Sequence, residues 1–140
     1  DSNQSHDSSR YRNGLMLMGS RHTRHSLNRG EALRLWYDVT LDTVRSERPE
    51  LNARQMSLML TVYIQPGPHT VRNLAAHLDV TKAVITRALD TLSGHGFVRR
   101  APDPSDKRSI TVKRTARGSN YLIGFAETIR GVTREMDAAA

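Results

Sequence analysis

The chain has 140 residues, enough for one compact domain and little more. It contains no cysteine, which excludes disulfides, thiolate zinc sites and thiol-based redox switches within it and fits a cytoplasmic protein. No run approaches the roughly 18 apolar residues of a membrane-spanning helix, so no membrane partner is expected.

The formal net charge of +7 is concentrated in one part of the chain. Residues 81–114 hold eight Lys or Arg against three Asp, whereas residues 29–80 and 115–140 each carry equal numbers of both signs. Such a localised basic patch is typical of phosphate binding, with an ordinary hydrated basic surface as the alternative. Residues 1–28 have four Arg against two Asp and no sustained periodicity, which predicts a flexible basic tail.

Two helices are expected before the basic region. The first spans about residues 29–48, because apolar residues recur at helical spacing and Pro49 ends the pattern. Its stripe consists of Leu33, Trp36/Tyr37, Thr40/Leu41 and Val44. The sole tryptophan, Trp36, is expected in a core or an interface, with the wall of a small-molecule pocket as the alternative.

Asn52 followed by Gln55 predicts a capping box at the start of the second helix, residues 53–64. Its expected buried stripe is Met56, Met59/Leu60 and Tyr63/Ile64. Two prolines and a glycine in residues 65–68 end the helix.

Residues 69–92 have the pattern of a helix-turn-helix. His69-Thr70 is expected to form a very short strand, and Thr70 to cap a helix over 71–78. Asp79-Val80 is the predicted turn, and Thr81 the predicted N-cap of the next helix. In that helix Val84, Ile85, Ala88, Leu89 and Leu92 form the inward stripe, which leaves Lys82, Ala83, Thr86, Arg87 and Asp90 towards solvent.

That outward face is small and polar near its start and cationic beside it. Such a face enters a DNA groove about 12 Å wide, where Thr and Ala can touch thymine methyls and Arg can bind guanine with two hydrogen bonds. A plain amphipathic surface helix is the alternative when this segment is taken alone.

A hairpin is expected after residues 94–96, whose glycines end the helix. Its strands are residues 97–100 and 109–114, with Ile110 and Val112 directed to the core. In the tip, residues 102–108, Asp103 or Asp106 is expected to pair with an Arg, while a remaining cation of Lys107 and Arg108 points at a minor groove.

The last helix should run from about residue 116 to 136. Its long apolar stripe is Tyr121/Leu122, Phe125, Ile129, Val132 and Met136. At the end of a small domain, such a stripe suggests a partner chain.

Three fragments resemble the MarR (multiple-antibiotic-resistance regulator) family. They are residues 71–78, residues 80–92 leading into 96–100, and residues 103–108 followed by Val112, Thr115 and Gly118. The resemblance implies a homodimeric winged helix-turn-helix regulator that binds a pseudo-palindromic operator. It places Lys82, Ala83, Thr86 and Arg87 in the major groove and Lys107 or Arg108 at the minor groove. It also implies release of DNA by a small, often aromatic or anionic effector between two lobes.

The family usually has two helices after the hairpin, whereas 26 residues follow Arg114 here, enough for one. We therefore expect a dimer lobe that is shortened, or completed by the first helix and the N-terminal tail.

The predicted fold is mainly α with a small β-hairpin, a winged helix-turn-helix with flanking dimerisation helices. A single domain is expected over residues 29–140, with dimerisation helices at 29–50 and 115–140 around a DNA-binding lobe at 51–114. The predicted DNA-binding residues are Thr81, Lys82, Ala83, Thr86, Arg87, Arg100, Lys107 and Arg108. The predicted effector-binding residues are Trp36, Tyr37, Met59 and Tyr63.

The predicted function is a sequence-specific DNA-binding transcriptional regulator, acting as a repressor that a small-molecule effector releases. The alternative is a winged-helix module that binds an acidic protein partner. No cofactor is expected, and His22 and His25 have no neighbouring carboxylate or cysteine that would complete a metal site. Zinc-protease, phosphate-loop and serine-hydrolase motifs are all missing from the sequence, so no enzyme is expected.

Overall fold

The computed structural model describes residues 26–139. His22 and His25 therefore lie outside the described residues, as does the predicted basic tail apart from residues 26–28. The elements are α2 (Arg29–Arg45), α3 (Ala53–Ile64), α4 (Val71–Leu78), α5 (Lys82–Gly94), β1 (Val98–Pro102), β2 (Ile110–Arg114) and α6 (Ala116–Ala139). This mainly helical chain with one antiparallel hairpin confirms the predicted fold class.

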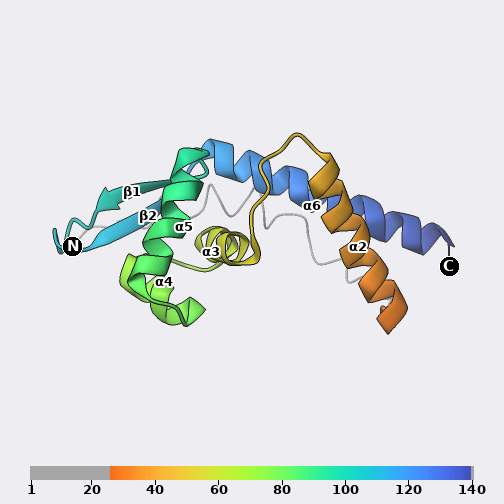
Figure 1. The fold of residues 1–140 in the computed structure, drawn as a ribbon, viewed down its shortest axis with the longest axis horizontal. Helices are drawn as coiled ribbons and strands as arrows, with labels where there is room; N and C mark the ends of the chain where they lie inside the picture. The colour runs from red at the N-terminus through yellow and green to blue at the C-terminus, as the bar shows by residue number, and fades with distance from the viewer. Residues whose placement is uncertain (1–25, 140) are drawn as a thin grey trace, which may run out of the picture.

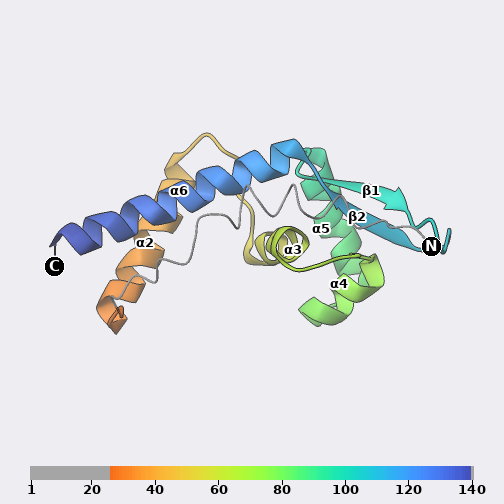
Figure 2. The same ribbon diagram turned by 180° about the vertical axis from the view of Figure 1, so that it is seen from behind.

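The molecule is elongated. The hairpin and the helices α3, α4 and α5 lie towards one end, and α2 lies at the other (Figure 1). Helix α6 runs along the molecule from the hairpin to α2 (Figures 1 and 2). We call residues 51–114 the winged-helix lobe. No helix among the described residues is both long enough and apolar enough to cross a membrane.

Short-range caps start the helices. Asn52 Oδ1 accepts from the Gln55 backbone N–H at 2.8 Å, and Gln55 Oε1 accepts from the Asn52 N–H at 3.0 Å, which confirms the predicted capping box. A second capping box joins Asn28 and Glu31 at the start of α2. That helix ends at Arg45, three residues before the predicted end, because Ser46 adopts an extended backbone.

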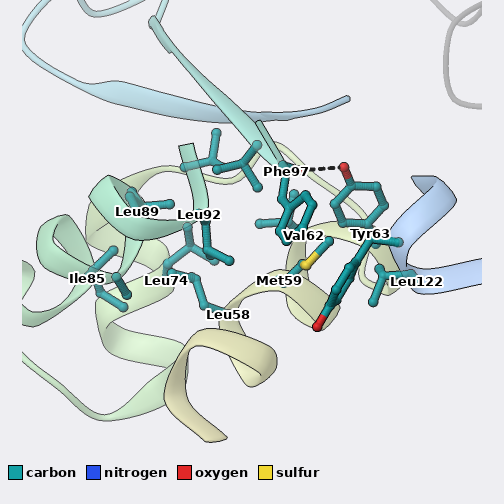
Figure 3. Packing of buried hydrophobic residues seen from close by; sticks show 14 of the residues in the cluster. Leu58, Met59, Val62, Tyr63, Leu74, Ile85, Leu89, Leu92, Phe97 and Leu122 are labelled. Carbon is teal, nitrogen blue, oxygen red and sulfur yellow. Dashed lines mark hydrogen bonds between the residues drawn. The ribbon is translucent and has the colours of Figure 1, made fainter. Parts of the chain in front are cut away.

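The core lies inside the winged-helix lobe, where side chains from α3, α4, α5, the hairpin and the start of α6 form one cluster (Figure 3). Helix α3 buries Leu58, Met59, Val62 and Tyr63, whereas Ile64 is exposed. The predicted stripe of α3 was therefore wrong at Ile64 and omitted Leu58 and Val62. Because α3 contacts α4, α5 and β2 together, its buried arc is wider than one stripe and shifted around the helix axis.

The hairpin pairs Val98 with Arg114 and Pro102 with Ile110 at its two ends. The prediction that Ile110 faces the core was wrong, because Ile110 is exposed and Thr111 is buried instead. The edge of β2 that does not pair with β1 is covered by Thr70, which forms an isolated β-bridge with Thr111. This bridge lies in the segment 69–70 that the sequence predicts as a very short strand. Thr111 also donates its hydroxyl hydrogen to Ala101 O at 3.0 Å, so its buried oxygen is satisfied.

Helix α6 belongs to two parts of the molecule. Gly118, Tyr121 and Leu122 in its first two turns are buried with the core of the winged-helix lobe. The rest of the helix extends past the lobe and packs against α2, where Val39 is buried and Thr128 Oγ1 donates to Asp42 Oδ2 at 3.1 Å. The helix continues three residues beyond its predicted end.

Most of the predicted apolar stripe of α2 is exposed among the described residues, with Thr40 and Leu41 half-buried. Leu33, Trp36, Tyr37 and Val44 are 71%, 63%, 56% and 63% exposed. At about 100° per residue, Leu33, Tyr37 and Val44 lie roughly 120–160° around α2 from the buried Val39, whereas Trp36 lies about 60° from it, at the edge of that face. Within residues 26–139, these four side chains are therefore an apolar surface that no other element covers.

Candidate nucleic-acid interface

Helix α5 separates its side chains as the sequence predicts. Ile85, Ala88, Leu89 and Leu92 are buried, and Val84 is half-buried. Lys82, Ala83, Thr86, Arg87 and Asp90 are all exposed. The buried side anchors the helix to the core and leaves a continuous polar and cationic face towards solvent.

The start of α5 is held by two local features. Thr81 Oγ1 accepts from the Val84 backbone N–H at 3.2 Å, which caps the helix. Asp79 takes a left-handed conformation with φ of 56°, and Val80 N donates to Ala75 O at 3.0 Å. This tight turn fixes the direction in which α5 leaves α4, so the exposed face projects from a rigid support.

The side chains on this face have defined roles in the free protein. The Thr86 hydroxyl donates to Lys82 O at 3.0 Å, which leaves its methyl group and an oxygen lone pair for other contacts. Of the charged residues on this face, Lys82 and Arg87 have no ion pair among the described residues, whereas Asp90 has one. Lys82 and Arg87 are therefore available as cations on the exposed face.

The hairpin of β1 and β2, which we call the wing, is joined to α5 by an ion pair. Arg100 Nη1 on β1 lies 2.7 Å from Asp90 Oδ1 on α5. Arg100 was predicted as a DNA-binding cation, and in the free protein its charge is balanced by Asp90. The sequence placed Asp90 on the outward face of its helix and Arg100 among the DNA-binding residues, but only the packing of β1 beside α5 brings the two together.

The wing tip is braced differently from the prediction. Asp103 Oδ1 accepts from the backbone N–H and the hydroxyl of Ser105, at 2.9 and 2.8 Å. These hydrogen bonds lower the pKa of Asp103 below its usual value. Asp106 Oδ1 likewise accepts from the Arg108 backbone N–H at 3.0 Å.

The expected pairing of an Asp with an Arg side chain in the tip was therefore wrong. Between residues 102 and 108 of the described structure, no ion pair joins an Asp to Lys107 or Arg108. A local bond to the backbone two residues away orders fewer rotamers than a bridge to a long arginine side chain. Lys107 and Arg108 consequently remain exposed at the tip.

The four residues predicted to bind an effector do not meet in this chain. Met59 and Tyr63 are buried in the core of the winged-helix lobe, whereas Trp36 and Tyr37 are exposed on α2. An open groove between α2 and α6 lies nearby, and Asp38, Asp42, Glu127 and Glu135 in its lining outnumber Arg45. Such a lining gives no support to an anionic ligand.

A short helix, a tight turn, a second helix with an exposed cationic face and a following hairpin define a winged helix-turn-helix protein. Comparison with known proteins agrees. The model of the MarR family matches residues 51–110. The transcriptional regulator HosA of Escherichia coli O111:H- is 36% identical over 76 residues, which are 54% of this chain and 56% of HosA.

The uncharacterised helix-turn-helix transcriptional regulator YkoM of Bacillus subtilis (strain 168) is 27% identical over 90 residues, 64% of this chain and 58% of YkoM. The chain thus spans a little over half the length of these two relatives.

Solved structures share the fold. The transcriptional regulator Tm0710 from Thermotoga maritima aligns with a TM-score of 0.66 at 19% identity, over 79% of this chain and 75% of that one. The regulator BldR from Sulfolobus solfataricus aligns with a TM-score of 0.54 at 26% identity, over 78% of each chain. The family model and these relatives support a winged-helix regulator of the MarR family, in agreement with the resemblance found in the sequence. The family and these relatives are transcriptional regulators and not enzymes.

Proposed function

We propose that this protein is a sequence-specific transcription regulator that binds double-stranded DNA as a homodimer. The observation that carries the proposal is the exposed face of α5, whose opposite side is buried in the core. That face presents small side chains beside cations, which suits insertion into a major groove about 12 Å wide. The exposed cations of the wing tip lie on the same winged-helix lobe and extend the contact along the duplex.

Each exposed residue of α5 has a role in this proposal. Ala83 and the Thr86 methyl contact thymine methyls, and Arg87 binds a guanine edge with two hydrogen bonds. Thr81 and Lys82, at the start of the helix, contact phosphates, where the helix dipole also favours an anion. Lys107 and Arg108 reach an adjacent minor groove, whereas Arg100 stays paired with Asp90 and becomes available to a phosphate only where that carboxylate is absent.

The exposed stripe of α2 supports a homodimer. A single copy of α5, the proposed recognition helix, and a single wing form a small interface that discriminates weakly between DNA sequences. Two copies of this pair about 34–36 Å apart read successive major-groove faces of the duplex. Four large apolar side chains on one helix are unusual on a monomer surface and fit burial by a second copy. In sedimentation experiments, Trp36→Asp is expected to yield monomers, while Arg54→Asp on α3 leaves the dimer intact. A monomeric wild-type protein would contradict this part.

DNA binding is tested by selection of duplexes from a random library, followed by gel shifts over a range of salt. Affinity for the selected sequence is expected to fall steeply with salt, by a slope of about 0.9 per neutralised phosphate. Arg87→Ala should lose discrimination between selected and random DNA, by about 1–3 kcal/mol if it binds one guanine. Arg134→Ala, an exposed arginine on α6, serves as the matched control.

Two outcomes would speak against the proposal. Equal loss of selected and random DNA in Arg87→Ala would mean that Arg87 contacts only phosphate. Retention of no duplex at low salt by the wild type would favour the module that binds an acidic protein partner.

The regulation proposed is repression that a small aromatic or anionic effector relieves, which the sequence resemblance supports. A bound effector raises the melting temperature of the folded protein by mass action. Thermal-shift screening of aromatic acids against the wild type tests this point, and a hit must also lower the affinity for the selected DNA.

A further inference from the structure

Helix α6 is the rigid link between the winged-helix lobe and the part of the molecule that carries α2. Its first turns are buried with the core of the lobe, and its remainder leaves the lobe to pack on α2 (Figure 2). The angle at which α6 leaves the lobe therefore sets where α5 lies relative to α2. The contacts at the first turn of α6 decide how firmly that angle is held.

The Tyr63 hydroxyl lies at this point. It donates to Phe97 O at 2.7 Å (Figure 3). It also accepts from Thr115 N at 2.9 Å. Phe97 directly precedes β1 and follows the turn after α5, and Thr115 directly precedes α6. One buried hydroxyl from α3 thus joins the segment that follows the recognition helix to the segment that begins α6.

Thr115 and Gly118 close the same junction. Thr115 Oγ1 donates to Gly96 O at 2.7 Å and accepts from Gly118 N at 3.0 Å, which caps α6. A Cβ atom on Gly118 would overlap both the Tyr63 hydroxyl and the Phe97 carbonyl oxygen. The backbones therefore approach so closely that α6 cannot tilt without breaking these hydrogen bonds.

We propose that Tyr63 is a positioning residue for DNA recognition: its hydroxyl fixes the angle between α6 and the winged-helix lobe, and so the half-site spacing that the dimer reads. This inference rests on the proposed function. A helix of 24 residues is about 36 Å long. A tilt of about 5° at one end moves the other by about 3 Å, close to the rise of one base pair, about 3.4 Å. A small change in the angle of α6 at Tyr63 therefore changes the distance between the two copies of α5 by about one base pair.

The test uses duplexes that carry two copies of the half-site selected by the wild type, separated by spacers that differ by single base pairs, together with an isolated half-site. The wild type should prefer one spacing sharply. Tyr63→Phe should reduce that preference by roughly fivefold to tenfold while the affinity for the isolated half-site is unchanged. Thr115→Val removes the bond to Gly96 O and should broaden the preference in the same way.

Tyr121→Phe is the matched control, since its hydroxyl also donates to a backbone carbonyl, Pro49 O at 2.9 Å, away from the start of β1. It should lower the melting temperature by a similar amount and keep the wild-type spacing preference. An unchanged preference in both Tyr63→Phe and Thr115→Val overturns the inference, as does equal broadening in Tyr121→Phe. A wild type that selects no DNA, or binds it as a monomer, instead overturns the proposed function.

Discussion

Removal of the ion pair between Asp90 and Arg100 is expected to change the folding stability little and the salt dependence of DNA binding measurably. Its side chains are 60% and 35% exposed, and such surface pairs contribute about 0.2–1 kcal/mol to folding. Asp90→Asn should therefore change the unfolding free energy by less than about 1 kcal/mol. The same substitution removes the carboxylate that balances Arg100, so a further cation becomes available to a phosphate.

One additional phosphate contact steepens the dependence of log affinity on log salt concentration by about 0.9. Between two salt concentrations that differ fourfold, this is worth about 3.5-fold in affinity. The assay measures binding of the selected duplex over a salt series, with urea unfolding of each variant. The double variant Asp90→Asn/Arg100→Gln is the control, and its slope should return to that of the wild type.

Two results would refute this reasoning. A slope that stays unchanged in Asp90→Asn would show that the released Arg100 does not reach a phosphate. A loss of unfolding free energy well above 1 kcal/mol would show that the pair supports the fold more than an exposed pair can.

Three further predictions concern stability. Burial, assisted by the nearby Arg114, lowers the pKa of His69 below 6.5. The unfolded chain therefore binds more protons than the folded one, and the stability of the fold should decrease as the pH drops below 6.5. His69→Gln should reduce this pH dependence of the melting temperature. Thr81→Ala removes the cap on Val84 N and should cost about 1 kcal/mol in urea unfolding, with no loss in Thr81→Ser. Leu92→Ala, in the fully buried core, should cost about 2–5 kcal/mol in the same assay, and a smaller loss would mean that the site collapses.

Local sequence was sufficient to predict the helices of the winged-helix lobe and the exposed face of α5. A cap at Asn52 or Thr81 acts over three residues, and the buried stripe of α5 repeats every three to four residues. Both signals are contained in a short window of sequence, so the position of α5 and the residues on its outer face followed without tertiary information.

Tertiary structure decided which faces meet a partner. The sequence shows that α2 has an apolar stripe, but only the fold shows that Leu33, Tyr37 and Val44 stay exposed, because α2 buries Val39 on another side of the helix. In β2, apolar and polar residues alternate, which predicts one buried face and one exposed face but not the effect of a neighbouring segment. The bridge from Thr70 covers Thr111, so this polar residue is buried.

The roles of individual polar groups depended most on the fold. Tyr63 and Thr115 are 52 residues apart, and Asp90 on α5 meets Arg100 only because β1 packs beside that helix. Periodicity reports the direction of a side chain from its own helix or strand, but not which distant group lies there. The sequence therefore determined the elements and the cationic face of α5, whereas long-range packing determined how the wing and α6 are held against it.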